Sequence, residues 1–562
     1  MTSTTQGLVT PGRAAALDSA HVGDIRGALG TISLDDVGAR TSASARLKTL
    51  LAIVGPGLIV MVGDNDAGAF STYGQAGQTY GTRLLWTFLL LVPVLYVNQE
   101  MVLRLGAVTG VGHARLILER FGRFWGAFSV IDLFILNALT IVTEFIGIAL
   151  AASYLGVPRI VAVVLASLVI VFAASTGSFR RFERIAMIFC AGSLLLVPVY
   201  VLAHPPAGQM ARGFTIPSIP GGSGQLATVM LLVIGIVGTT VAPWQLFFQQ
   251  SYIIDKRITP RFMRYEKADL WLGIVIVVIG GGALMGATAA AFAGARHVPF
   301  TDASGLAAGL SAYAGHAAGA LFAVALLDAS MIGAFAVSLS TAYAVGDMLG
   351  LKHSLHRGVK QAKGFYAMYA ALIAIAATIV LIPGSPLGLL TEGVQVLAGV
   401  LLPSATVFLL LLCNDKEVLG PWVNGRATNV LASIVVGILV MLSAILMVSV
   451  VFGTISSGQV IAIMGGCVAA AALTGGFLLL RRRRGGRGAA AAARPARAGH
   501  RRGGLTSAAR KDRDNWRMPP LTMLAPAQMS VARRVAMSAM WLYLGVAIIL
   551  VIVRVVEIAL GG

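Results

Sequence analysis

The sequence has few charged residues, few cysteines and no histidine deep inside its apolar segments. Only 12% of the 562 residues are charged, 57% are hydrophobic, and the mean hydropathy is +0.83. Soluble globular domains carry about twice that share of charge, so this class is excluded. The three cysteines, Cys190, Cys413 and Cys467, show no CxxC spacing. This excludes a disulfide framework and a zinc cluster, and the composition predicts an all-α polytopic membrane protein.

Apolar runs long enough to cross a bilayer, which takes about 20 residues, recur along most of the chain. Thirteen of them begin near Leu51, Leu84, Phe124, Val157, Ile185, Val229, Leu270, Ala317, Tyr366, Leu389, Leu431, Val460 and Met537. The first is not expected to be a cleaved signal peptide, because it follows a long polar and mixed stretch. We expect a disordered cytoplasmic tail over residues 1–45, a domain of about 12 spans over 46–480, a basic disordered linker over 481–534 and a further transmembrane helix over 535–562.

Positive charge is divided unevenly between the loops, and this sets the expected orientation. Loops on one side of the first twelve spans hold 23 Lys and Arg residues, and loops on the other side hold 4. The positive-inside rule therefore places the N-terminus in the cytoplasm of the cell membrane. The stretch 481–534 adds 15 more. We expect it to contact anionic lipid headgroups or to be a solvated linker, and not to bind nucleic acid, because no aromatic platform accompanies its arginines.

Two carboxylates lie inside the first apolar run, in the segment Gly63-Asp64-Asn65-Asp66. A charge at this depth costs at least about 3 kcal/mol, so it persists mainly where it binds an ion, relays a proton or faces water. The neighbouring glycines indicate that the helix breaks there. On a continuous helix Asp64 and Asp66 would point apart, so only an unwound segment lets both face one ion, and Asp64 is either a second ligand or a bystander.

A second interrupted segment occurs five spans later, at Gly238-Thr239-Thr240-Val241-Ala242-Pro243-Trp244. Taken alone, Pro243 could simply kink a helix. A five-span offset, however, places the first member of each half on opposite sides of the membrane, as an inverted repeat requires. Paired interrupted helices indicate a transporter's substrate site, where exposed carbonyls and helix ends can coordinate a cation.

Several segments, taken in order, resemble the Nramp divalent-metal transporters. They are Gly55-Pro56-Gly57-Leu58, Asp66-Ala67-Gly68-Ala69-Phe70, Gln75-Ala76-Gly77, Leu105-Gly106-Ala107-Val108-Thr109-Gly110, Thr143-Glu144-Phe145-Ile146-Gly147, Val237 to Pro243, and Gln395 with Leu402-Pro403. The resemblance covers about residues 46–480. It implies the LeuT-type fold, with two five-helix inverted repeats over about 50–203 and 228–412 plus additional C-terminal helices. It also implies alternating access around an ion held between the first and sixth helices.

Two positions depart from the family's pattern in ways that bear on the cargo. Typical members read Asp-Pro-Gly-Asn in the first helix and Met-Pro-His in the sixth, whereas here Ala69 replaces the coordinating asparagine and Ala242 replaces the methionine. Soft sulfur favours transition metals, while hard Mg²⁺ prefers oxygen donors. The shorter side chains also suit an ion that keeps several waters. The substitutions resemble the Nramp-related magnesium transporter branch, so Mg²⁺ is the expected cargo, with Mn²⁺ also carried.

The sequence offers few groups for proton coupling. The family's aspartate three residues before the third-helix glutamate is Ile141 here, which leaves Glu144 without that neighbour, and the sixth-helix histidines are represented by Trp244 and Gln249. A group that titrates near neutral pH is therefore missing, which favours transport without proton coupling. Two alternatives stay open: a proton-coupled Mn²⁺ or Fe²⁺ symporter, and a LeuT-type transporter of an organic cation or amino acid.

The expected site gathers residues from both breaks and from the tenth helix. The metal-binding positions are Asp64, Asp66, Ala69, Thr239, Ala242 and Gln395, and the gating or supporting positions are Asn65, Thr240, Trp244, Glu144 and Gln249. Asn65 and Thr240 could instead satisfy backbone groups around the breaks, and Trp244 could be packing. No nucleophile-and-base pairing, phosphate loop or zinc spacing indicates an enzyme. We therefore expect no catalytic residue and no cofactor, and we expect a monomer.

Overall fold

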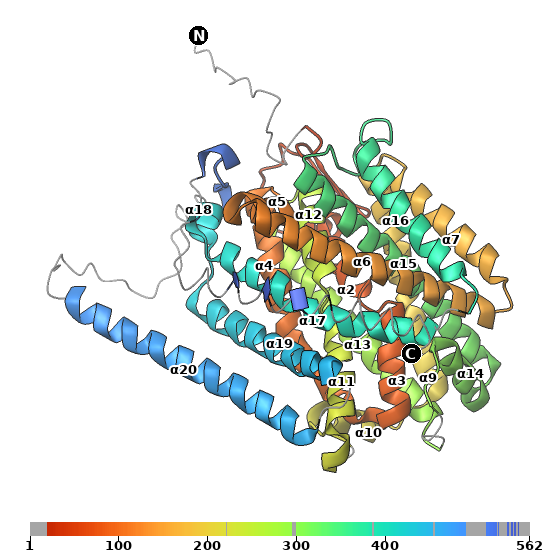
Figure 1. Cartoon of the computed structure of the whole chain (residues 1–562). Coiled ribbons are helices and arrows are strands. Elements are labelled where there is room, and N and C mark those ends of the chain that lie inside the picture. Colours follow the sequence, from red (N-terminus) through yellow and green to blue (C-terminus); the bar gives the residue numbers. More distant parts are fainter. Residues whose placement is uncertain are drawn as a thin grey trace, which may run out of the picture.

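The computed structural model describes residues 19–220, 222–294, 299–384, 387–452, 456–489 and 513–524, with a few further positions up to residue 549. Within these ranges nearly all regular structure is helical (Figure 1). The first half contains β1 (Ile25–Arg26), β2 (Thr31–Ile32), α1 (Ala43–Ile53), α2 (Pro56–Val62), α3 (Ala67–Tyr80), η1 (Gly81–Leu84), α4 (Trp86–Thr109), α5 (His113–Phe121), α6 (Arg123–Tyr154), α7 (Arg159–Ala174), α8 (Phe179–Gly192), η2 (Ser193–Leu195), α9 (Leu196–Ala203) and α10 (Ala207–Thr215). The second half and C-terminal part contain α11 (Gly222–Thr240), α12 (Pro243–Asp255), η3 (Pro260–Phe262), α13 (Met263–Ala291), α14 (Ala303–Ala314), α15 (His316–Leu349), α16 (Lys363–Leu381), α17 (Leu387–Cys413), α18 (Lys416–Leu419), η4 (Gly420–Trp422), α19 (Arg426–Phe452), α20 (Ser457–Ala489) and η5 (Leu521–Met523).

The apolar helices match the predicted spans in order. Among the described residues nine helical segments are long and apolar enough to cross a membrane, and α1 with α2 makes a tenth across a bend of 53°. α7 and the first part of α20, Ser457–Leu473, are shorter apolar helices. Their positions correspond to the segments predicted to begin between Leu51 and Val460, and the count of twelve membrane crossings stays a prediction. The thirteenth, from Met537, lies largely outside the described residues.

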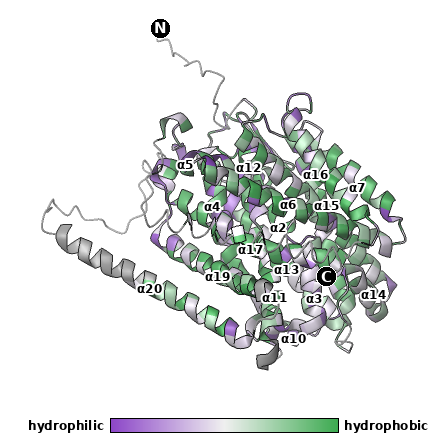
Figure 2. Ribbon diagram, in the orientation of Figure 1, coloured by the Kyte–Doolittle hydropathy of each residue, from purple (hydrophilic) through white to green (hydrophobic). Residues whose placement is uncertain are grey.

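The outer surface of the bundle is apolar, as a lipid environment requires. Along α7, Ile160, Val164, Leu168 and Phe172 are all strongly exposed. Their four-residue spacing places them on one face of the helix. In water such a stripe would be an aggregation liability, whereas in a bilayer it is solvated by lipid tails. Figure 2 shows hydrophobic residues along most of the long helices. The chain is an integral membrane protein with several spanning helices.

The spanning helices fall into two consecutive sets that pack together. The first set runs from α1 to α9 and the second from α11 to α17, and α6 of the first packs along α15 of the second. Each set begins with an interrupted helix: α2 gives way to α3 in the first, and α11 to α12 in the second. α11 packs against α3 and α17, so the two interruptions face the same interior region.

The predicted mobile N-terminal tail is wrong for the described residues 19–42, which fold onto one end of the bundle. Ile25 and Ile32 pair across the β1–β2 sheet and are buried. The backbone N–H of Ala28 donates to Glu183 Oε2 at 2.6 Å, and Arg257 donates from Nη2 to the carbonyl of Ala20 at 2.7 Å. These polar groups lie far apart in the sequence, so local composition does not reveal that they satisfy one another.

A buried ion pair closes the same end of the bundle. Lys256 Nζ lies 2.7 Å from Glu183 Oε1, and both side chains are fully buried. Lys256 also donates to the carbonyls of Ile53 and Val54, at 2.6 and 2.9 Å. In addition, Asp269 of α13 accepts from the N–H of Gly57 at 2.6 Å. The joint between α1 and α2 is therefore tied to α8, to the residue after α12 and to α13.

The described part of the predicted basic linker also contacts the bundle. α20 continues as a helix to Ala489, past the expected boundary at residue 480. The arginine-rich residues 490–512 lie outside the described residues. After them, the guanidinium of Arg513 lies 3.9 Å above the Trp422 ring, and Trp422 Nε1 donates to the Arg513 carbonyl at 2.9 Å. The linker prediction is therefore wrong for residues 513–524, where an aromatic ring provides the contact that arginine needs.

Candidate metal site between two broken helices

The first helix break exposes two carboxylates at different points of the turn. α2 ends at Val62 and α3 begins at Ala67, so Asp64 and Asp66 lie in the non-helical connection. Asp66 caps α3: its backbone is extended, and its Oδ1 accepts from the N–H of Ala69 at 2.9 Å. A capping aspartate satisfies one of the unpaired N–H groups of a helix start. Both acids are buried, and the unwound backbone removes the helical constraint that would point them apart.

The second break carries no acidic side chain. α11 ends at Thr240, and α12 begins at Pro243, which occupies the first helical turn. Proline suits this position because its missing N–H would have had no partner there. Ala242 precedes it in an extended conformation and makes no side-chain cap. The second break therefore contributes carbonyl groups, helix ends and a methyl group.

Gln245 joins the two breaks, although it is not among the site residues predicted from the sequence. Its Nε2 donates to Asp64 Oδ1 and also lies 3.2 Å from the carbonyl oxygen of Thr240. Its Oε1 accepts from Gln99 Nε2 of α4 at 3.0 Å. All three side chains are fully buried. A glutamine two residues after Pro243 in an apolar span is the signal that could have found it, because uncompensated amides are rare at such depth.

Glu144 of α6 reaches the same break from another side. Its Oε2 accepts from the N–H of Ala67 at 3.2 Å, and its carboxyl lies within hydrogen-bonding reach of the Asp66 carboxyl. A hydrogen bond between two carboxyl groups requires a proton on one of them. Glu144 thus has an acidic neighbour in space, Asp66, although position 141 on its own helix is isoleucine.

Gln395 of α17 lies directly against the start of α3. A Cβ atom added to Gly68 would overlap the amide of Gln395, so this close approach requires glycine. The Gln395 Nε2 has no hydrogen-bond partner among the described residues. The structure therefore brings Gln395 to the first break, beside Asp66.

Several buried oxygens at the breaks are without a partner in the described part of the chain. They are Asp64 Oδ2, Glu144 Oε1 and Thr239 Oγ1. Leaving a buried polar atom unpaired costs about 1–3 kcal/mol, and a bound cation or its waters would satisfy these atoms. No three His, Cys, Asp or Glu residues form a ready metal cluster within the described ranges. Carboxylate, hydroxyl, amide and carbonyl oxygens are therefore the donors on offer, which fits a hard, partly hydrated cation.

Other predicted positions make different contacts. The Thr240 hydroxyl lies 2.6 Å from the Tyr73 hydroxyl and donates to the Ile236 carbonyl, so it satisfies groups around the break. The Asn65 amide nitrogen lies 3.5 Å from the Val277 carbonyl on α13, which directs this side chain away from Asp66.

The two remaining gating predictions lie on α12. The Trp244 ring packs beside Gly63 and edge-on to Phe248. Gln249 is buried, and its amide has no partner among the described residues. Within the described residues, neither side chain forms a hydrogen bond with the carboxylates of the first break. Trp244 therefore fills space next to that break, and the role of Gln249 stays a prediction.

Comparison with known proteins agrees with this arrangement. The family model described as "Natural resistance-associated macrophage protein-like", Nramp, matches residues 57–449. The chain belongs to the Nramp family. A "Divalent metal cation transporter MntH" of Ralstonia nicotianae is 30% identical over 402 residues, which are 68% of this chain and 88% of that protein. Members of the Nramp family are metal transporters, so the chain is not an enzyme and its metal is cargo that needs no cofactor.

Solved Nramp structures share the fold. A manganese transporter of Eremococcus coleocola, crystallised with an aromatic bis-isothiourea compound, matches 80% of this chain and 98% of its own with 22% identity and a TM-score of 0.58. A mutant of the same transporter gives 0.57 with 22% identity. The LeuT-type fold expected from the sequence, with two five-helix inverted repeats and additional C-terminal helices, is confirmed.

Proposed function

We propose that this Nramp protein carries divalent metal cations by alternating access, with Mg²⁺ preferred, Mn²⁺ also accepted, and no proton coupling. The observation that carries the proposal is the chemistry of the two breaks. Oxygen and amide groups converge there, with Asp64 and Asp66 on one side, while Ala242 presents a methyl group where the family pattern has a sulfur.

Ligand chemistry supports this preference for hard ions. A thioether favours Mn²⁺ and Fe²⁺ over alkaline-earth ions, and its loss removes that discrimination. Mg²⁺ also dehydrates reluctantly and is usually held through one or two carboxylates and several waters. Asp66 with Asp64, together with the unpartnered Thr239 hydroxyl, matches such a donor set.

One contact favours a second candidate, a proton-coupled transporter of Mn²⁺ or Fe²⁺. Asp66 and Glu144 lie within hydrogen-bonding reach, so a proton held between them would leave when a metal ion binds Asp66. The names of the relatives, a divalent metal cation transporter and a manganese transporter, are compatible with this candidate.

A transport assay with two readouts separates the candidates. Purified protein in liposomes loaded with a metal-sensitive dye and a pH-sensitive dye is exposed to Mg²⁺, Mn²⁺ or Fe²⁺ gradients. We expect saturable Mg²⁺ entry, competition between Mg²⁺ and Mn²⁺, and no acidification of the lumen. Saturable Mn²⁺ entry with lumen acidification and no competition from Mg²⁺ would establish the second candidate.

The same proposal includes the membrane context. We place the protein in the cell membrane with the N-terminus in the cytoplasm, because 23 of the 27 basic residues in the loops of the first twelve spans lie on that side. We also expect it to be a monomer. The segment 481–534 then faces the cytoplasmic leaflet, where its arginines are attracted to anionic headgroups. Protease protection of an N-terminal tag in sealed right-side-out vesicles tests the orientation.

A further inference from the structure

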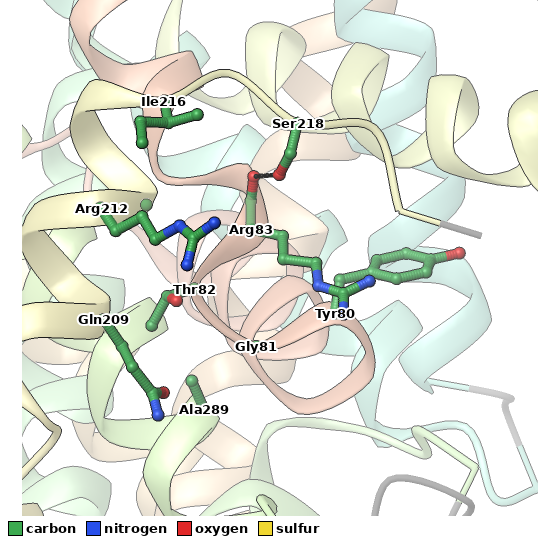
Figure 3. Close-up of a pocket in the computed structure, with 10 residues that line it drawn as sticks. Tyr80, Gly81, Thr82, Arg83, Gln209, Arg212, Ile216, Ser218 and Ala289 are labelled. Atoms are coloured by element: carbon green, nitrogen blue, oxygen red, sulfur yellow. Dashed lines mark hydrogen bonds between the residues drawn. The ribbon is translucent and has the colours of Figure 1, made fainter. Parts of the chain in front are cut away.

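Apart from the candidate metal site, a polar cavity lies at the end of the bundle opposite the N-terminal segment. It has a volume of about 500 Å³ and is lined by the end of α3, by η1, by α10 with the residues that follow it, and by Ala289 of α13. Figure 3 shows Arg83 and Arg212 entering it from different elements. α10 lies close to η1 because Gly213 faces the Thr82 carbonyl, and a Cβ there would overlap that oxygen.

The charge of this cavity is unusual for its position. Among the described residues, Arg83, Arg159 and Arg212 are the basic residues between the spans on this side, and two of these three line the same cavity. No residue lining the cavity is acidic. Neither guanidinium forms an ion pair with a described residue. Two guanidiniums without an ion-pair partner among the described residues would repel an incoming metal ion, so they favour an anionic ligand.

Neutral hydrogen-bonding groups complete the lining. Gln209, Thr82, Ser218 and Tyr80 all border the cavity, and they offer an amide and three hydroxyls. The Ser218 hydroxyl already donates to the Arg83 carbonyl, at 3.3 Å. Guanidinium groups with hydroxyl and amide donors are the usual partners of a tetrahedral phosphate, which arginine can bind through two parallel hydrogen bonds.

The depth of the cavity matches the headgroup layer. Arg83 lies in η1, three residues before α4 begins at Trp86, and Trp86 donates from Nε1 to the Ser218 carbonyl at 3.1 Å. One turn further, Leu89 and Leu90 are 46% and 59% exposed. Tryptophan is enriched at the membrane interface, and exposed leucines mark the lipid-facing zone below it. The cavity therefore opens at the level where phospholipid phosphates lie.

We propose that this cavity binds a phosphate group on the membrane face opposite the N-terminal segment, with Arg83 and Arg212 as the charged ligands. The group is carried either by a phospholipid headgroup or by free phosphate. The site is separate from the metal path between the broken helices, so it stands whichever cation the protein carries.

Native mass spectrometry of the full-length protein in detergent tests the lipid arm, with phosphatidylglycerol and phosphatidylcholine added in series. Calorimetric titration with inorganic phosphate tests the free-anion arm. In whichever of the two measurements the wild type binds, we expect Arg83→Gln/Arg212→Gln to weaken that binding by at least about tenfold, because two charge-assisted contacts are lost. Arg159→Gln is the matched control: it removes one basic residue from the same face, and Arg159 does not line the cavity.

A charge-retaining variant and a folding measurement separate loss of the binding site from loss of the fold. Arg83→Lys/Arg212→Lys retains the charge and should bind more tightly than the glutamine pair, and a thermal melt shows whether each variant is folded. Phospholipid binding that depends on the arginines assigns the lipid source, and phosphate binding that depends on them assigns the free anion. Equal binding by the wild type, the glutamine pair and the Arg159→Gln control in both arms would overturn the proposal.

Discussion

The two broken helices occupy corresponding places in the two halves of the bundle, yet only the first is charged. The first break holds Asp64 and Asp66 and receives Glu144 from α6. The second break offers the end of α11, the start of α12 and the methyl group of Ala242. The two breaks are alike in backbone but differ in side-chain chemistry. In the function proposed above, the first break would attract the cation and the second would influence which cation fits.

Gln245 links the charged first break to the uncharged second break. The second break has no charge of its own, but this amide donates to Asp64 and approaches the Thr240 carbonyl. It therefore ties the charged half to the neutral one without adding a positive group that would compete with the cargo. Any movement of α12 relative to α2 and α3 has to exchange this contact, so Gln245 is one of the side chains that link the two halves, alongside the Tyr73–Thr240 hydrogen bond.

Asp66→Asn should produce the largest effect, because it removes the charge at the first break and leaves the shape nearly unchanged. Loss of one member of a buried charged contact usually costs about 2–5 kcal/mol. We expect metal affinity to fall by at least about 30-fold and uptake into liposomes to be lost. Asp132→Asn is the control, since Asp132 is also buried but is bonded to Ser404 on α17; if that variant loses as much, the assignment of the charge to the first break fails.

Gln245→Leu should rank second. It leaves Asp64 Oδ1 without its described donor while keeping a similar volume. An orphaned buried oxygen costs about 1–3 kcal/mol, so we expect uptake to slow by about tenfold with the protein still folded. Gln249→Leu on the same helix is the matched comparison, because its amide has no partner among the described residues. Equal losses in the two variants would show that the contact between the breaks is unimportant.

Ala242→Met should change selectivity more than rate. Placing a sulfur at the second break should strengthen Mn²⁺ binding by about tenfold and leave Mg²⁺ binding unchanged or weaker, as soft donors favour transition metals. Calorimetric titration of both ions gives the ratio. Ala242→Leu adds similar bulk without sulfur, so an identical shift in that variant would attribute the effect to size.

Thr240→Val should give the smallest effect on transport. It removes a hydroxyl that contacts Tyr73 and Ile236, so we expect the free energy of unfolding to fall by about 1 kcal/mol. Uptake should stay close to that of the wild type. Thermal denaturation measures the first quantity, and Tyr73→Phe should reproduce it. A severe loss of uptake with unchanged melting would instead make Thr240 a ligand.

The sequence predicted the features that have a local cause. The glycines beside the carboxylates predict the first break, Pro243 predicts the second, and the spans follow from the apolar runs. Gln245 was missed because its partner lies 181 residues earlier. Glu144 was judged by its helical neighbour Ile141, whereas its acidic neighbour comes from another helix.

The N-terminal segment shows a different limit. Its composition is polar enough to predict disorder, and only the positions of Glu183 and Arg257 in the folded bundle explain why it is ordered. A segment whose polar groups are satisfied by distant residues has no periodicity to detect. The contact of Asn65 with α13 could not be predicted from the sequence for a similar reason: it depends on how the backbone bends at the first break.

The closure of the bundle by its first residues also has a consequence for biosynthesis. Ala20 leaves the ribosome 237 residues before Arg257, and Ala28 leaves it 155 residues before Glu183. At about 5–20 residues per second, the segment waits about 10–50 s for the last of these partners. During this interval its hairpin can pack on α1 but lacks the partners from α8 and from the end of α12. Residues 19–42 can therefore make all their contacts at this end of the bundle only after the sixth span has been inserted. This segment is synthesised early but reaches its final position late.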